Sequence, residues 1–243
     1  HPTPLVAREH RIELNERIGA AGEIVRAPSA NDIDAAIDEV IAAGAGACAI
    51  GFVFSFRNDA HEQEFAAALR KRAPHVAVSV SSEVQPEFRE YERLSTTVLN
   101  AYLGPAMAKY LKGFLESVHR LAPKTEPYTI HSNGGLMTAA TARDYPVRTC
   151  LSGPAAGVVG AAETARDAGF PNIITFDVGG TSTDVSVVAE GRTSFTADRR
   201  VAGHPVRTPM LDIHVIGAGG GSIAWIDDAG GLKVGPRSAG ANP

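Results

Sequence analysis

The chain has 243 residues, of which 44% are hydrophobic and 21% are charged, with a formal net charge of −4. This length and apolar content suffice for one large domain or two smaller ones. Because no run of positive charge is present, no nucleic-acid partner is expected. The apolar stretches are too short for a membrane span. Two cysteines, Cys48 and Cys150, cannot form a disulfide framework, so we expect a reduced, cytoplasmic setting.

Neither end of the sequence resembles a natural terminus. The chain begins with His1 rather than methionine, and residues 238–243 carry no helix or strand pattern. We therefore expect an internal piece of a longer polypeptide, to which any function would belong.

Strand and helix patterns alternate along the first half of the chain. Residues 5–25 alternate apolar and polar side chains, which predicts a hairpin or edge strands. Ser29 and Asp32 form an approximate capping box before the apolar stripe from Ile33 to Ile41, which predicts an amphipathic helix. Further patterns predict strands at 47–54, 76–80 and 128–131, and helices over 59–72 and about 86–121. Because a helix separates the first two of these strands, we expect a parallel pair with a right-handed crossover.

Other polar side chains in this half predict structural roles. His61, Glu62 and Glu64 lie near the start of a predicted helix and indicate a solvated helix face.

Glycine becomes dense in the second half of the chain. We therefore predict an α/β fold with a boundary near residue 98, which separates a region 1–98 from a region 99–243.

The strongest chemical signal lies in residues 173–188. Two apolar strands are joined by a turn that contains Asp177, two glycines and the hydroxyl residues 181–183. Glycines let the backbone approach a ligand closely, so that successive N–H groups can face phosphate oxygens. Asp177 suits a Mg²⁺ shell, usually through water. A tight β-turn is the structural alternative, but such a turn needs only about two residues, so we predict phosphate binding.

A second glycine-rich loop, Gly217–Ser222, is a weaker candidate for anion binding. The alternative is a flexible or tightly turning loop. Just before it, Asp212 could hold Mg²⁺, whereas His214 is expected to be a structural histidine rather than a proton carrier or metal ligand.

Two further segments have both a functional and a structural interpretation. The segment Asn133-Gly134-Gly135 follows a predicted strand and could contact substrate or nucleotide, although a simple Asn-Gly turn explains it equally well. Residues 151–162 predict a helix with one face of small residues, against which another helix could pack with its backbone close.

Together these motifs resemble the actin/Hsp70/sugar-kinase ATPase superfamily, in which a small-residue helix precedes the strand that bears a phosphate loop. Within it, the chain resembles the hydantoinase A/5-oxoprolinase family along essentially its whole length. The motifs that carry this resemblance are Phe54–Glu62, Ser81–Val84, Tyr91–Arg93, Ser132–Met137, Leu151–Gly157, Phe176–Asp184 and Gly217–Ala224.

The resemblance implies a ribonuclease H-like fold, with a mixed sheet flanked by helices. It also implies an ATP- and Mg²⁺-dependent enzyme, in which ATP phosphorylates a cyclic amide before ring opening or drives a related carboxylation. A hydantoinase B-type partner subunit or domain would complete the reaction. Asp177 and Asp184 would lie at the Mg-nucleotide, and Asp212 is a weaker metal candidate. The candidate phosphate-binding residues are Gly179, Gly180, Thr181, Ser182, Thr183, Gly219, Gly220 and Gly221.

The sequence departs from the family pattern in two ways. It holds one Asp-x-Gly-Gly-Thr motif where the family has a second near its N-terminus, and it lacks the expected adenosine-binding segment. Two other functions therefore stay open: a chaperone- or filament-like ATPase without a small-molecule substrate, and a non-catalytic fragment that needs the rest of its chain.

Overall fold

The computed structural model describes residues 3–240, which divide into two compact units. Unit 1 comprises His1–Thr129, Met137–Cys150 and Ala197–Thr208, and unit 2 comprises Ile130–Leu136, Leu151–Thr196 and Pro209–Pro243. These units do not divide at residue 98, which lies inside a helix of unit 1. The boundary at residue 98 between two family regions stays a prediction.

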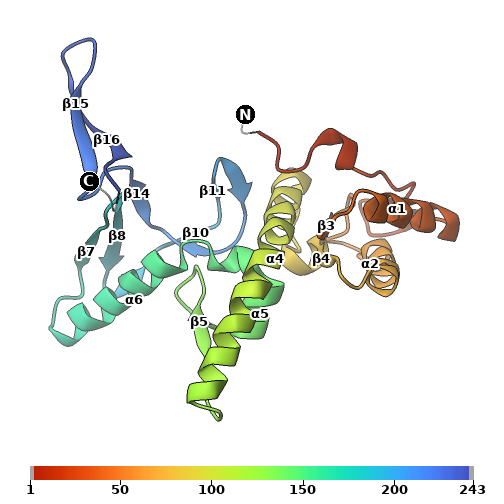
Figure 1. Ribbon diagram of the computed structural model, residues 1–243, viewed down its shortest axis with the longest axis horizontal. Helices are drawn as coiled ribbons and strands as arrows, with labels where there is room; N and C mark the ends of the chain where they lie inside the picture. Colours follow the sequence, from red (N-terminus) through yellow and green to blue (C-terminus); the bar gives the residue numbers. More distant parts are fainter. Residues whose placement is uncertain (1–2, 241–243) are drawn as a thin grey trace. The chain divides into compact units, whose positions relative to one another are not determined.

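The predicted strand–helix–strand motif forms the centre of unit 1. β3 (Ala47–Ile50) and β4 (Ala77–Val80) pair in parallel, and α2 (Ala60–Arg72) connects them (Figure 1). α1 (Ala30–Ala42) precedes them and begins with the predicted capping box, in which the Ser29 hydroxyl accepts from the Asp32 N–H. The parallel pair and both helices are therefore confirmed.

Alternation along β3 and β4 explains how helices cover both faces of the pair. The larger side chains belong to the main core of unit 1, together with α1 and α2; they are Cys48, Ile50, Val78 and Val80. On the opposite face, Ala47, Ala49, Ala77 and Ser79 are small. This face admits α4 (Glu90–Leu121), from which Asn100 donates to the Ser79 hydroxyl at 2.9 Å.

Several predicted boundaries in unit 1 need correction. The hairpin predicted for residues 5–25 is present as β1 (Arg17–Ile18) and β2 (Ile24–Arg26), but it is shorter than predicted and a 3₁₀ helix, η1 (Arg8–His10), precedes it. β3 ends four residues before the predicted end at residue 54, because the chain turns there and Phe54 has a left-handed φ of 59°. The remaining elements of unit 1 are α3 (Ser81–Val84), α5 (Ala139–Asp144), η2 (Pro146–Thr149), β11 (Arg199–Val201) and β12 (His204–Val206).

The predicted solvated face at the start of α2 is wrong for two of its three residues. Glu62 is fully buried and accepts from the Phe52 N–H at 2.9 Å, the Ser81 hydroxyl at 2.7 Å and the Ser82 N–H at 2.9 Å. His61 is also buried, and only Glu64 is exposed. Glu62 therefore ties the ends of β3 and β4 together.

Replacing Glu62 is expected to destabilise unit 1 strongly. Glu62→Leu leaves three donors without their buried acceptor, so we expect a loss of about 2–4 kcal/mol in the free energy of unfolding. Urea unfolding followed by circular dichroism measures it. Glu64→Leu, on the exposed side of the same helix, is the control. Equal midpoints for the two variants would contradict the structural role of Glu62.

Unit 2 is built on an antiparallel sheet with the strand order β14–β8–β7. Its strands are β7 (Ile173–Val178), β8 (Thr183–Ala189) and β14 (His214–Ile216), with β9 (Arg192–Thr193) pairing to β8. α6 (Ser152–Asp167) lies along the sheet and packs Ala155 and Val158 against Val188. Other elements of unit 2 are β10 (Phe195–Thr196), β13 (Met210–Leu211), β15 (Ser222–Ile226) and β16 (Leu232–Ser238). The strands β5 (Tyr128–Ile130) and β6 (Leu136–Thr138) each have residues in both units.

The small-residue face of α6 has open space beside it. A Cβ atom at Gly157 or Gly160 would meet nothing within 4 Å in residues 3–240. The expected backbone-close contact with another helix is therefore not found in this part of the chain. Within the same residues, no helix combines the length and apolar character needed to cross a bilayer.

Both cysteines are free and half-buried. Burial raises the pKa of the Cys48 thiol to about 11, and it also raises the pKa of Cys150. Neither side chain is therefore a ready thiolate nucleophile near neutral pH.

Candidate functional site

The predicted phosphate hairpin is present in unit 2. β7 and β8 pair in antiparallel register, with Val178 opposite Thr183 at the end of the ladder. Residues 179–182 form the connection, which we call the phosphate turn, and the Gly179 N–H donates to the Ser182 carbonyl at 2.9 Å. The two predicted strands are confirmed, but the turn is shorter than predicted, because Asp177 lies in β7 and Thr183 lies in β8.

The two acidic candidates face each other across this hairpin. Asp177 on β7 lies directly opposite Asp184 on β8. Asp177 comes shortly before the phosphate turn, and Asp184 comes shortly after it. Asp177 is exposed and Asp184 is half-buried; neither carboxylate has a hydrogen bond or ion pair within residues 3–240. Like charges directly opposite on a sheet are destabilising. Such a pair is suited to a cation, because hard cations prefer carboxylate and water oxygens.

The phosphate turn offers unused donors. The N–H groups of Gly180, Thr181 and Ser182 donate to no acceptor in the described part of the chain. A Cβ atom on Gly180 would meet nothing within 4 Å, so space is open beside its backbone. Exposed amides, two neighbouring hydroxyls and an acid pair fit a phosphate group with its metal.

Thr183 differs from the other hydroxyl candidates. It is 5% exposed, and its hydroxyl donates to the Ala218 carbonyl at 2.7 Å. This hydrogen bond does not support the predicted contact with phosphate, and the side chain instead joins the start of β8 to the second glycine loop.

The second glycine loop lies against the phosphate turn rather than presenting its own anion site. The Gly219 N–H donates to the Ser222 hydroxyl at 2.8 Å. The N–H groups of Gly220 and Gly221 donate to carbonyl oxygens of the phosphate turn, at 2.9 and 2.8 Å. All three amides are occupied, so the prediction that these glycines bind phosphate finds no support in their hydrogen bonds.

Asp212 is not brought to the acid pair. The register of β14 with β8 places Val215 opposite Asp184, so Asp212 lies farther from the phosphate turn. Residues 3–240 hold no group of three or more His, Cys, Asp or Glu side chains arranged for a metal ion. Metal binding by Asp212 stays a prediction, and His214, expected to be structural, is exposed on β14.

Asn133, Gly134 and Gly135 form a turn with an evident structural role. The Asn133 side-chain oxygen accepts from the Gly135 N–H at 2.9 Å. Gly134 has a φ of 84°, and a Cβ atom there would lie 2.6 Å from Val159 of α6. These contacts account for the residue types without a ligand, and substrate contact stays a prediction.

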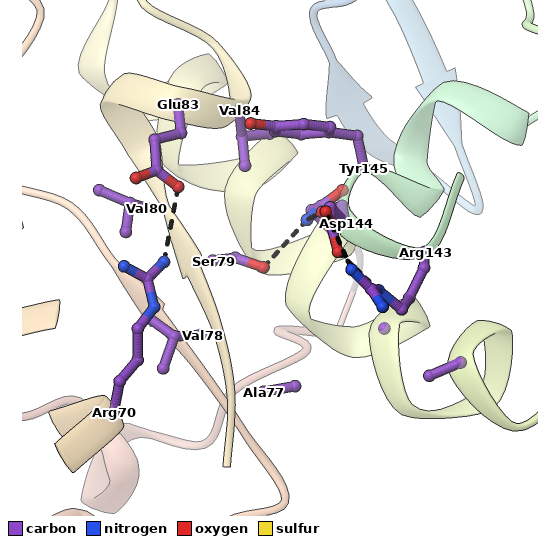
Figure 2. A pocket seen from close by; sticks show the side chains of 13 residues that line it. Arg70, Ala77, Val78, Ser79, Val80, Glu83, Val84, Arg143, Asp144 and Tyr145 are labelled. Carbon is purple, nitrogen blue, oxygen red and sulfur yellow. Dashed lines mark hydrogen bonds and ion pairs between the residues drawn. The ribbon is translucent and has the colours of Figure 1, made fainter. Parts of the chain in front are cut away.

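Unit 1 contains a pocket of about 390 Å³ that the sequence does not indicate (Figure 2). β4 lines it, together with charged side chains of both signs from neighbouring elements. Arg70 lies 3.6 Å from Glu83, and Arg143 donates to Asp144 at 2.8 Å. The side-chain hydrogen bond with Asp144 raises the pKa of Arg143. Because these residues come from the three helices α2, α3 and α5, no local motif marks the pocket.

Two protein families match this sequence, and together their matches cover nearly the whole chain. Residues 93–243 match the family described as Hydantoinase/oxoprolinase, and residues 1–73 match the Hydantoinase/oxoprolinase N-terminal region.

Curated relatives include subunits of larger enzymes. The chain is 41% identical over 239 residues to the caprolactamase subunit alpha of Pseudomonas jessenii. This alignment covers 98% of the present chain and 34% of the caprolactamase subunit. It is 33% identical to the acetophenone carboxylase gamma subunit of Aromatoleum aromaticum, over 100% of this chain and 34% of that protein. Identity to the 5-oxoprolinase of Saccharomyces cerevisiae is 35%, over 93% of this chain and 17% of that protein.

Two solved structures share the fold. The ATP-dependent caprolactamase of Pseudomonas jessenii superposes with a TM-score of 0.87 at 40% identity, over 100% of this chain and 35% of that one. Nucleotide-free acetone carboxylase superposes with a TM-score of 0.82 at 27% identity, over 98% of this chain and 34% of that one. The mixed α/β fold is therefore one found in ATP-dependent enzymes.

Proposed function

The chain belongs to the hydantoinase/oxoprolinase family, and we propose that it forms part of an ATP-dependent enzyme that opens a cyclic amide. It spans 34% of the length of the caprolactamase subunit alpha, so the activity is assigned to the intact protein. The 41% identity to that subunit supports a lactam as the substrate class.

The phosphate turn and its opposed carboxylates carry this proposal. We assign phosphate binding to the free N–H groups of Gly180 and Thr181 and to the hydroxyls of Thr181 and Ser182. Asp177 and Asp184 would hold Mg²⁺, mostly through water, which relieves the repulsion between two carboxylates on neighbouring strands. The hairpin with α6 behind it also supports an actin/Hsp70-like ATPase fold for unit 2.

The chemistry explains why an amide-opening enzyme needs such a turn. An amide is a poor electrophile, and ATP supplies the phosphoryl group that turns its oxygen into a leaving group. The backbone donors of the turn hold phosphate oxygens in place and stabilise negative charge that develops on them. The acid pair fixes the metal, so the residues of this hairpin position the phosphates and leave bond cleavage to other groups.

A hydantoinase B-type subunit or domain is the proposed partner. Caprolactamase and acetophenone carboxylase relatives are named as subunits, which supports an assembly of more than one chain. The partner would complete ring opening.

ATP-driven carboxylation is the second candidate. The match to the acetophenone carboxylase gamma subunit covers this whole chain at 33% identity, and acetone carboxylase shares the fold. Both reactions use the same phosphate site and differ in the molecule that receives the phosphoryl group.

Phosphate release from Mg-ATP by the intact protein with its partner tests the proposal. We expect release to depend on a lactam, with hydantoin, 5-oxoproline and caprolactam as the panel. Release that depends on a ketone and bicarbonate would favour carboxylation instead. Release indifferent to every small molecule would favour a chaperone-like ATPase and contradict both.

A further inference from the structure

We propose that the loop Ala218–Ser222, which we call the clamp loop, positions the phosphate turn by holding its backbone in one conformation. The inference rests on the proposed function, because it concerns the same site. It assigns the clamp loop a positioning role and no contact with nucleotide.

Two backbone hydrogen bonds join the clamp loop to the phosphate turn. The Gly220 N–H donates to the Gly179 carbonyl at 2.9 Å, and the Gly221 N–H donates to the Gly180 carbonyl at 2.8 Å. The two segments lie about 40 residues apart in sequence but pack backbone to backbone within unit 2. The two carbonyl groups of the turn therefore point toward the clamp loop.

A third bond comes from a buried side chain. The Thr183 hydroxyl, at the first position of β8, donates to the Ala218 carbonyl at 2.7 Å. The Ser222 hydroxyl accepts from the Gly219 N–H at 2.8 Å and closes the clamp loop on itself. The clamp loop thus contacts both the phosphate turn and the strand that leaves it.

The direction of the two carbonyls determines where the amides of the turn point. Both peptide bonds, Gly179–Gly180 and Gly180–Thr181, are trans. In a trans peptide the C=O and the following N–H point in opposite directions. Because both carbonyls face the clamp loop, the N–H groups of Gly180 and Thr181 face away from it. They therefore form a pair of donors on the open side of the turn, where an anion can bind.

Space at Gly219 shows how closely the two loops approach. A Cβ atom on Gly219 would lie 2.4 Å from the Gly179 carbonyl oxygen and 2.9 Å from the Ser182 nitrogen. Its φ lies outside the left-handed region, so glycine is needed here for space and not for backbone freedom. By contrast, a Cβ atom on Gly217 would have its nearest neighbour, Pro236, at 4.0 Å.

The two-stranded ribbon of β15 and β16 supports the clamp loop. The Ala239 N–H donates to the Gly221 carbonyl at 2.7 Å, and β15 continues directly from Ser222. A Cβ atom on Gly235 of β16 would lie 2.2 Å from the Gly217 carbonyl oxygen. A loop supported by β14 on one side and by the β15–β16 ribbon on the other can hold the phosphate turn in a fixed geometry.

The test compares Gly219→Ala with Gly217→Ala in the intact protein with its partner. We expect Gly219→Ala to raise the dissociation constant for Mg-ADP roughly tenfold or more, because a shift of about 1 Å misplaces the amide pair. Gly217→Ala is expected to bind as the wild type does. Equal affinities for Gly219→Ala and the wild type would overturn the proposal.

Hydrogen–deuterium exchange gives a readout that needs no nucleotide. The amides of Gly220 and Gly221 are expected to lose protection in Gly219→Ala and to keep it in Gly217→Ala. Unchanged protection in Gly219→Ala would overturn the clamp. Wild-type protein that binds no Mg-ADP, together with the expected exchange pattern, would refute the proposed function and leave the clamp standing.

A side-chain variant covers the case in which Gly219→Ala does not fold. Thr183→Val removes the bond to Ala218 at nearly constant volume, whereas Thr183→Ser keeps the hydroxyl. We expect the affinity of Thr183→Ser for Mg-ADP to be at least roughly fivefold higher than that of Thr183→Val, because only serine keeps the hydrogen bond to Ala218. Equal affinity of the two variants would count against the clamp.

Discussion

Asp177→Asn in the intact enzyme is expected to lower ATP turnover by roughly 100-fold or more, because the metal that neutralises phosphate charge loses a carboxylate. The amide has nearly the same shape but no charge. Asp177 is exposed and makes no hydrogen bond or ion pair in residues 3–240, so the substitution removes no native contact. It also removes the repulsion from Asp184 on the neighbouring strand. Phosphate release under saturating Mg-ATP measures the effect.

Folding and charge controls accompany this variant. The melting temperature of Asp177→Asn is expected to equal or slightly exceed that of the wild type, since a like-charge pair is lost. Asp228→Asn changes an exposed acid in the turn between β15 and β16 and is expected to keep full turnover. Near wild-type turnover by Asp177→Asn would contradict the assigned role of the acid pair.

Gly180→Val is expected to weaken Mg-ADP binding by roughly 10- to 100-fold while the protein still folds, because the side chain fills the space beside the amide pair. A Cβ atom at Gly180 meets nothing within 4 Å, and its φ is accessible to other residues. The loss therefore falls on the ligand and not on the protein core. Titration calorimetry with Mg-ADP measures the affinity.

A matched substitution separates the ligand effect from the general effect of valine. Gly46 also has open space around its Cβ position and an ordinary φ, and it lies in unit 1 next to β3. Gly46→Val is expected to leave nucleotide affinity within about twofold of the wild type. Unchanged affinity in Gly180→Val would show that phosphate binds elsewhere.

Local patterns predicted the main elements of unit 1 well. The capping box at Ser29 and the parallel β3–β4 pair follow from short-range signals, since a cap and a short apolar run are properties of a few neighbouring residues. The end of β3 was missed because the apolar run continues beyond Gly51 to Phe54, although the chain already turns there and Phe54 has a left-handed φ. The burial of Glu62 was missed because its three donors come from segments 10 and about 20 residues away.

The features of the candidate site likewise divide into those that a local sequence pattern predicts and those that depend on distant segments. The hairpin could be predicted, because it follows from one continuous segment, whereas the opposition of Asp177 and Asp184 depends on the strand register and comes from the structure. The contact between the two glycine loops could not, because both loops have the composition of an anion site and only the fold shows which amides are occupied. For the same reason, the hydroxyl of Thr183 was assigned to phosphate although it binds a carbonyl of the other loop.

A crystal structure of the intact enzyme with Mg-ADP would test the central claim most directly. We expect phosphate oxygens within hydrogen-bond distance of the Gly180 and Thr181 N–H groups, on the side of the turn away from the clamp loop. We also expect Mg²⁺ beside Asp177 and Asp184, directly or through water. Phosphates bound away from residues 179–182, with both amides still free, would contradict the central claim.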